Sequence, residues 1–119
     1  METGLIELLE QIEKLKKSKK LILVEGLKDK NALAELGITN VLVLKKALFA
    51  VAEQVAEICS ECIILTDLDA EGKELYRRLK MHLEKAGVKV DDSFRNFLFK
   101  NTKLSHIEGL SAYVEHLQE

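Results

Sequence analysis

The sequence predicts an α/β fold in which helices cover both faces of a parallel sheet of four strands. Short apolar runs of strand length alternate along the chain with segments in which apolar residues recur at helical spacing. Alternation of this kind is typical of strand–helix–strand units joined by right-handed crossovers. The length of 119 residues and the apolar content of 47% suit one hydrophobic core, so we expect a single domain over 1–119.

The expected helices and strands follow one another in a regular order. An amphipathic helix is predicted over 3–18, where the apolar residues at helical spacing are Leu5, Ile6, Leu8, Leu9, Ile12 and Leu15. The strands are expected at 21–26, 40–44, 62–67 and 88–90. The later helices are expected at 29–38, 45–59, 72–87 and 93–99, with a last one opened by a capping-box pattern of Ser105 and Glu108. The core of the domain then spans about 20–100, between an N-terminal helix and a helical tail.

The net charge and the hydropathy of the chain limit the partners that it can bind. The formal net charge of −2 excludes a global basic field, although a local basic cluster is formed by Lys14, Lys16, Lys17, Lys19 and Lys20. A polyanionic partner would therefore be bound locally. No apolar run approaches the roughly 18 residues that a membrane span needs, and the N-terminus lacks the pattern of a signal peptide. We expect a cytoplasmic protein with no membrane partner.

The cysteines and histidines form no metal-binding pattern of their own. Cys59 and Cys62 make a lone CxxC motif that ends a helical segment and enters a strand, whereas a redox CxxC normally opens a helix. No second CxxC or paired histidine completes a zinc site. We interpret both cysteines as packing residues. The same interpretation applies to His82, His106 and His116, which are scattered singly.

Acidic side chains gather where two strands of the predicted sheet end. Glu25 ends the first strand, and Asp67, Asp69 and Glu71 follow the third. With a strand order of 2-1-3-4 these strands are neighbours, and their carboxyl ends form the crevice where ligands of open α/β sheets bind. Carboxylates there can hold a hard cation such as Mg²⁺, which in turn can hold a phosphodiester. The alternative is that Asp69 or Glu71 only caps the following helix.

Two segments, VEGLKDKNALAELGI and ILTDLDAEG, together resemble the Toprim domain shared by bacterial-type primases, topoisomerases and small ribonucleases that mature ribosomal RNA. The resemblance spans about 20–100 and implies a three-layer, Rossmann-like Toprim fold. It matches a Glu-Gly motif to Glu25 and Gly26 and an Asp-x-Asp motif to Asp67 and Asp69. The resemblance thereby implies that Glu25 acts as a general acid or base and that Asp67 and Asp69 bind Mg²⁺ (or Mn²⁺). Secondary acidic candidates suggested by some relatives are Asp29, Glu71, Asp91 and Asp92.

The sequence around the motifs narrows the activity that the resemblance implies. It carries neither the zinc-binding and catalytic domains of primases nor the DNA-gating domains of topoisomerases. Tyr76 and Tyr113 are interpreted as packing residues rather than strand-passage nucleophiles. We therefore expect a Mg²⁺-dependent nucleic-acid phosphodiester enzyme, and among these a ribonuclease-like hydrolase of structured RNA. The alternative is an adaptor module that holds nucleic acid without cleaving it, within a ribonucleoprotein or beside a protein partner, and that would tolerate Glu25→Gln.

Contact with a polyanion requires cations near the acidic site. The candidates are basic residues that follow the two motifs, namely Lys28, Lys30, Lys73, Arg77 and Arg78. We expect them to bind nucleic acid, with RNA favoured over DNA. The alternative is that they form only a solvated helix face.

Other acidic or nucleotide-binding α/β families fit the sequence less well. A phosphorelay receiver requires an acid pair after its first strand, whereas the first strand here ends in Glu25 and Gly26. A haloacid-dehalogenase-like phosphatase carries its Asp-x-Asp on the first strand rather than the third. Neither GxGxxG nor GxxxxGK[ST] occurs, so no nucleotide cofactor is expected.

Overall fold

A computed structural model describes residues 2–118, and over these residues the strands form one parallel sheet in the order β2-β1-β3-β4. The predicted fold class and strand order are confirmed. The strands are β1 (Leu21–Val24), β2 (Val41–Val43), β3 (Glu61–Ile64) and β4 (Lys89–Val90). The helices are α1 (Glu2–Ser18), α2 (Leu27–Glu35), α3 (Leu48–Ile58), α4 (Ala70–Lys85), α5 (Ser93–Asn101) and α6 (Leu110–Gln118), with a 3₁₀ turn η1 (Ile107–Gly109) before α6. None of the described helices is both long and apolar enough to cross a membrane.

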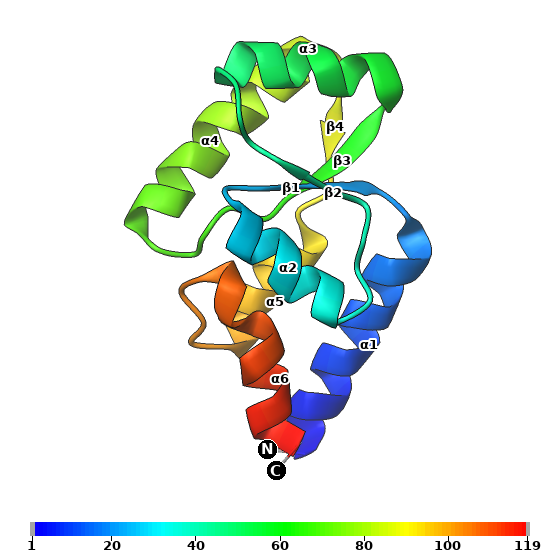
Figure 1. The fold of residues 1–119 in the computed structure, drawn as a ribbon, viewed down its shortest axis with the longest axis vertical. Coiled ribbons are helices and arrows are strands. Elements are labelled where there is room, and N and C mark those ends of the chain that lie inside the picture. The colour runs from blue at the N-terminus through cyan, green and yellow to red at the C-terminus, as the bar shows by residue number, and fades with distance from the viewer. Residues whose placement is uncertain (1, 119) are drawn as a thin grey trace.

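Different helices bury the two faces of the sheet, which gives the three predicted layers (Figure 1). On one face, Leu23 of β1 and Ile64 of β3 pack with α3 and α4. On the other, Ile22 and Val24 of β1 and Ile63 of β3 pack with α1, α2, α5 and α6. Successive strand residues point to opposite faces, so strands covered on both sides are apolar at every position, as LILV in β1 is.

The two central strands end at a common edge. β1 and β3 are neighbours, with Leu21 opposite Cys62 and Leu23 opposite Ile64. Both strands end earlier than predicted, β1 at Val24 and β3 at Ile64. Glu25, Asp67 and Asp69 therefore lie in loops at the shared carboxyl edge rather than in the strands themselves, whereas Glu71 lies in α4.

The C-terminal segment differs from its prediction. No helix begins at Ser105; instead His106 is the N-cap of η1, without a side-chain capping hydrogen bond, and α6 begins at Leu110. Ile107 and Leu110 are fully buried in the core that also contains residues of α2. Burial of these two side chains draws the segment inward before the helix can start, so the capping-box prediction was wrong.

The two cysteines are free thiols. Cys62 is buried in β3, and this burial raises the pKa of its thiol to about 12. Cys59 is half-buried, and its Sγ donates a hydrogen bond to the Val55 carbonyl oxygen at 3.6 Å. A thiol with so high a pKa is unreactive near neutral pH, in keeping with packing rather than redox chemistry.

Candidate metal centre

The loop between β3 and α4 folds back on itself and presents two aspartates. Asp69 is the N-cap of α4, and its Oδ1 accepts a hydrogen bond from Gly72 N at 2.8 Å. The buried Thr66 donates from Oγ1 to the Gly72 carbonyl oxygen at 2.7 Å. A Cβ at position 72 would lie 1.9 Å from the Asp67 carbonyl oxygen, so only glycine fits. The shape of the loop thus depends on Gly72 as well as on its acids.

Arg95 of α5 holds this loop from the interior. Its side chain is 2% exposed, and it donates from Nη1 to the Thr66 carbonyl oxygen at 2.6 Å and from Nη2 to the Asp67 carbonyl oxygen at 2.9 Å. The guanidinium carbon also lies 4.6 Å from the Tyr76 ring centroid and 5.1 Å from that of Phe99. Burial lowers the pKa of Arg95 from its ordinary value, but an arginine remains charged. Loop carbonyls and aromatic rings therefore stabilise this buried charge. The sequence did not predict this contact of Arg95 with the loop.

Glu25, immediately after β1, lies against the same loop. Its Oε2 accepts a hydrogen bond from Asp67 N at 2.8 Å, although the two residues are far apart in the chain. The adjacency of β1 and β3 brings them together, as the strand order predicted. Catalysis by Glu25 stays a prediction.

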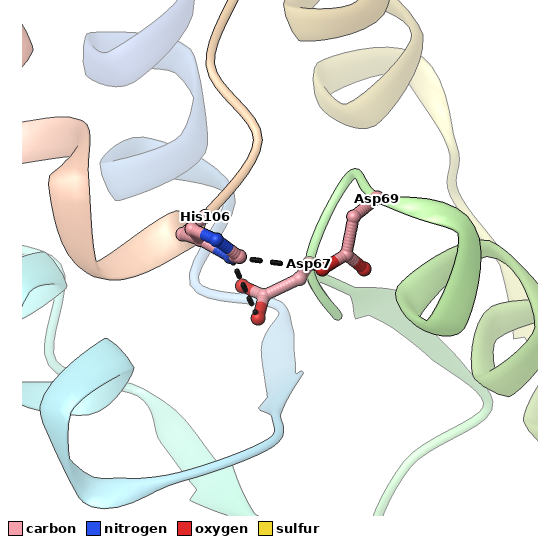
Figure 2. Close-up of side chains that lie close together, drawn as sticks. All are labelled: Asp67, Asp69 and His106. Carbon is pink, nitrogen blue, oxygen red and sulfur yellow. Dashed lines mark ion pairs between the residues drawn. The ribbon is translucent and has the colours of Figure 1, made fainter.

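The C-terminal segment adds a third side chain to the aspartates. His106 and Asp67 point toward one another, and Asp69 lies beyond them at the start of α4 (Figure 2). The distance from His106 Nδ1 is 3.3 Å to Asp67 Oδ2 and 3.8 Å to Asp69 Oδ2. Backbone contacts fix the segment, since Ile107 N donates to Asp67 Oδ1 at 2.9 Å and Leu68 N to the Ser105 carbonyl oxygen at 2.8 Å.

These three side chains could share one cation. Each of Asp67, Asp69 and His106 offers a donor atom, and the three atoms lie within 4.8 Å of one another. The hydrogen bond to Asp67 raises the pKa of His106 above its ordinary value. The interpretation of His106 as a packing residue was therefore wrong, because its side chain is exposed and lies beside two acids. No sequence motif around His106 marks it as a candidate metal ligand; only its neighbours in the folded chain do.

The secondary acidic candidates lie outside this group of donors. Asp29 is buried and accepts a hydrogen bond from Gly26 N at 3.0 Å, and burial raises its pKa. Glu71 is exposed in the first turn of α4. Asp91 accepts a hydrogen bond from Lys20 Nζ at 2.8 Å, which lowers its pKa to about 2. Metal roles for Asp29 and Glu71 stay predictions.

The predicted basic contacts lie on two helices that begin at the site. Lys28 and Lys30 are exposed on α2, and Lys73, Arg77 and Arg78 are exposed on α4. Arg77 forms an ion pair with Glu74, with Nη2 and Oε2 2.6 Å apart, which leaves it less available to a phosphate. Lys73 is one helical turn from Asp69, to whose carbonyl oxygen its backbone N donates at 2.9 Å. Nucleic-acid binding by these residues stays a prediction.

Comparison with protein families identifies the module. The family model described as the Toprim domain matches residues 19–92, more than half of the chain. This chain belongs to the Toprim family. The matched part of the Toprim protein contains Glu25, Asp67 and Asp69, whereas Arg95 and His106 follow it. The donor group therefore combines family motif residues with a side chain from outside the matched segment.

Two archaeal relatives are similar to this Toprim protein over most of its length. A UPF0292 protein of Methanocaldococcus jannaschii is 34% identical over 115 residues, which cover 91% of this chain and 90% of that protein. A UPF0292 protein of Pyrococcus abyssi is 39% identical over 88 residues, covering 73% of this chain and 67% of that protein. The names of both relatives state no activity.

Two solved structures share the fold of the Toprim protein. A protein from Aquifex aeolicus matches with a TM-score of 0.77 and 39% identity, covering 83% of this chain and 94% of that one. The zinc-binding and RNA polymerase domains of the Aquifex aeolicus primase match with a TM-score of 0.57 and 24% identity, covering 88% of this chain and 27% of the primase chain. The primase likeness is one of fold. Family membership and the donor group together support a metal-binding function related to nucleic acids.

Proposed function

We propose that this Toprim protein is a metal-dependent hydrolase of phosphodiester bonds in structured RNA. The observation that carries the proposal is the convergence of groups at Asp67. Its backbone N donates to Glu25 Oε2 at 2.8 Å, while its carboxylate oxygen lies 3.3 Å from His106 Nδ1. A group able to transfer a proton thus lies next to a candidate cation site, which is the combination that metal-assisted hydrolysis requires.

The donor set fits a divalent cation. Two carboxylates suit Mg²⁺ and Mn²⁺, and an imidazole suits transition metals better than Mg²⁺. Three protein donors leave coordination positions for water and phosphate. When bound, such a cation neutralises charge on the phosphodiester and activates water for attack. We propose Mg²⁺ or Mn²⁺ as the cofactor, with tighter binding of Mn²⁺ because of His106.

The residues near this cation site have three different roles in the proposed reaction. Glu25 is held by the Asp67 backbone and is free of the donor group, so its carboxylate can accept a proton from attacking water or return one to the leaving oxygen. Arg95 holds the loop after β3 in place through its hydrogen bonds to the carbonyl oxygens of Thr66 and Asp67. The exposed lysines Lys28, Lys30 and Lys73 offer positive charge to the phosphates that flank the scissile bond.

Metal-dependent cleavage tests the proposal. The purified chain is incubated with labelled structured RNA, single-stranded RNA and DNA, each with Mg²⁺, with Mn²⁺ and with EDTA. We expect cleavage of the structured RNA in the presence of either metal, none with EDTA, and none by the Asp67→Asn variant. Retained RNA binding without cleavage of any substrate would contradict the hydrolase and support the adaptor alternative.

Replacing His106 by Ala is expected to weaken Mn²⁺ binding by at least about tenfold and Mg²⁺ binding by less, since an imidazole contributes more to a transition metal. Isothermal titration with each metal measures both affinities. His116→Ala, on the exposed side of α6, is the matched control and should bind both metals as the wild type does. Equal Mn²⁺ affinity in His106→Ala and wild type would remove His106 from the metal centre.

A further inference from the structure

A hollow of about 260 Å³ lies between α4 and α5, close to the metal centre. It is lined by Lys73, Tyr76, Arg95, Asn96 and Phe99. Its walls thus combine two aromatic rings, two cations and an amide. Phe99 is 39% exposed, so part of a large apolar ring faces water beside these polar groups. Such a ring offers a flat apolar surface on which a planar partner can stack.

The ring of Phe99 lies close to positive charge. Lys73 Nζ lies over it, 5.2 Å from its centroid, and Arg95 Cζ lies 5.1 Å from the same centroid. Both distances are within the range of cation–π attraction. The Arg95 guanidinium is buried and fixed by loop carbonyls, whereas Lys73 is exposed. Lys73 can therefore swing aside when a partner occupies the ring, while Arg95 keeps its place.

The hollow and the metal centre share structural elements. Arg95 lines the hollow and also donates to the Asp67 carbonyl oxygen at 2.9 Å. Lys73 lines it from a position four residues along α4 from the N-cap Asp69, a rise of about 6 Å. A molecule in the hollow would therefore lie against the loop that carries the two aspartates.

We propose that the hollow binds an unpaired RNA base, stacked on Phe99, next to the phosphate held at the metal centre. This inference rests on the proposed function and refines its substrate to structured RNA with an unpaired nucleotide beside the scissile bond. Paired bases are already stacked on their neighbours, whereas bases of loops, bulges and ends can be splayed onto aromatic side chains. Lys73 contacts a phosphate of that nucleotide, and the Asn96 amide offers a donor and an acceptor to the base edge.

Replacing Phe99 by Leu tests the stacking, because leucine keeps the apolar volume but removes the aromatic face. Single-stranded RNA that carries 2-aminopurine beside a non-hydrolysable linkage is titrated with each variant in the presence of Mg²⁺, and fluorescence reports both binding and stacking. Phe99→Leu is expected to weaken binding about 5- to 100-fold, the range for loss of one stacked base, and to abolish the quenching. Phe99→Tyr should restore both.

Salt dependence separates stacking from charge. Phe99→Leu should leave the slope of log K against log salt unchanged, whereas Lys73→Gln should reduce it by roughly 0.7 for one lost phosphate contact with a single strand. Phe49→Leu, at an exposed phenylalanine of α3, is the matched control and should bind as the wild type does.

The outcomes distinguish this inference from the proposed function. Wild-type RNA binding that Phe99→Leu leaves unchanged would overturn the stacking alone. An equal loss of affinity for fully duplex RNA in Phe99→Leu would also overturn it, because a duplex offers no unpaired base. A wild-type chain that binds no RNA, with or without metal, would overturn both.

Discussion

Glu25→Gln is expected to lower the rate of RNA cleavage by about 10²- to 10⁴-fold, the usual contribution of a positioned acid or base. The structure indicates that this substitution removes proton transfer and keeps the hydrogen bond to the loop. A glutamine at position 25 can still accept the hydrogen bond that Asp67 N donates to Glu25 Oε2 at 2.8 Å, so the loop should keep its shape. What the amide cannot do is take up and release a proton. Single-turnover cleavage at saturating metal measures the loss.

Binding measurements show whether the lost rate comes from proton transfer. Substrate affinity and metal affinity should stay within about threefold of the wild-type values, because Glu25 lies outside the donor group. Glu57→Gln, at an exposed glutamate of α3, is the matched control and should cleave normally. Cleavage by Glu25→Gln at the wild-type rate would show that another group transfers the proton.

Arg95→Met is expected to lower the free energy of unfolding by about 3 kcal/mol. The substitution removes the donor that binds the carbonyl oxygens of Thr66 and Asp67 and that reaches Gly72 at 3.5 Å, and these oxygens are left short of partners in the interior. The free energy of unfolding of small domains is roughly 5–15 kcal/mol, so the variant should still fold at low temperature. Chemical denaturation followed by circular dichroism gives the difference.

Metal binding distinguishes a positioning role of Arg95 from a purely structural one. In the folded state of Arg95→Met, affinity for Mn²⁺ should fall about 10- to 100-fold, as it does when a group that orients metal ligands is lost. Arg95→Lys should recover part of the stability but little of the affinity, because a shorter side chain with a single nitrogen does not reproduce the planar fork that orients the two carbonyl oxygens. Arg78→Met, at an exposed arginine of α4, serves as control. Wild-type Mn²⁺ affinity in folded Arg95→Met would show that Arg95 only stabilises the fold.

The sheet and the acidic loop could be predicted because their signals are local. LILV and CII are apolar at every position, as strands buried on both faces must be, and the strand order then places Glu25 beside Asp67. Strand ends were predicted less well. β1 and β3 stop at the last paired residues, and apolar character continues beyond them in Leu65, which is buried without belonging to the strand.

Arg95 and His106 could not be predicted because their roles arise from contacts between distant segments. Arg95 lies in the predicted helix SFRNFLF, and nothing in that pattern shows that its guanidinium reaches the loop after β3. His106 reaches Asp67 only because burial of Ile107 and the hydrogen bond from Leu68 N to Ser105 draw the tail toward the sheet edge. Both residues also follow the segment that matches the Toprim family.

Calorimetric titration of Mn²⁺ into the wild type and into the Asp67→Asn, Asp69→Asn double variant shows whether the two aspartates bind the metal. Asparagine keeps an oxygen that can accept the hydrogen bonds from Ile107 N and Gly72 N, so the double variant should fold, and relief of repulsion between the acids should leave its stability unchanged or slightly raised. We expect saturable binding of one Mn²⁺ per wild-type chain and none in the variant. Equal affinity in both proteins, or no binding by the wild type, would contradict it.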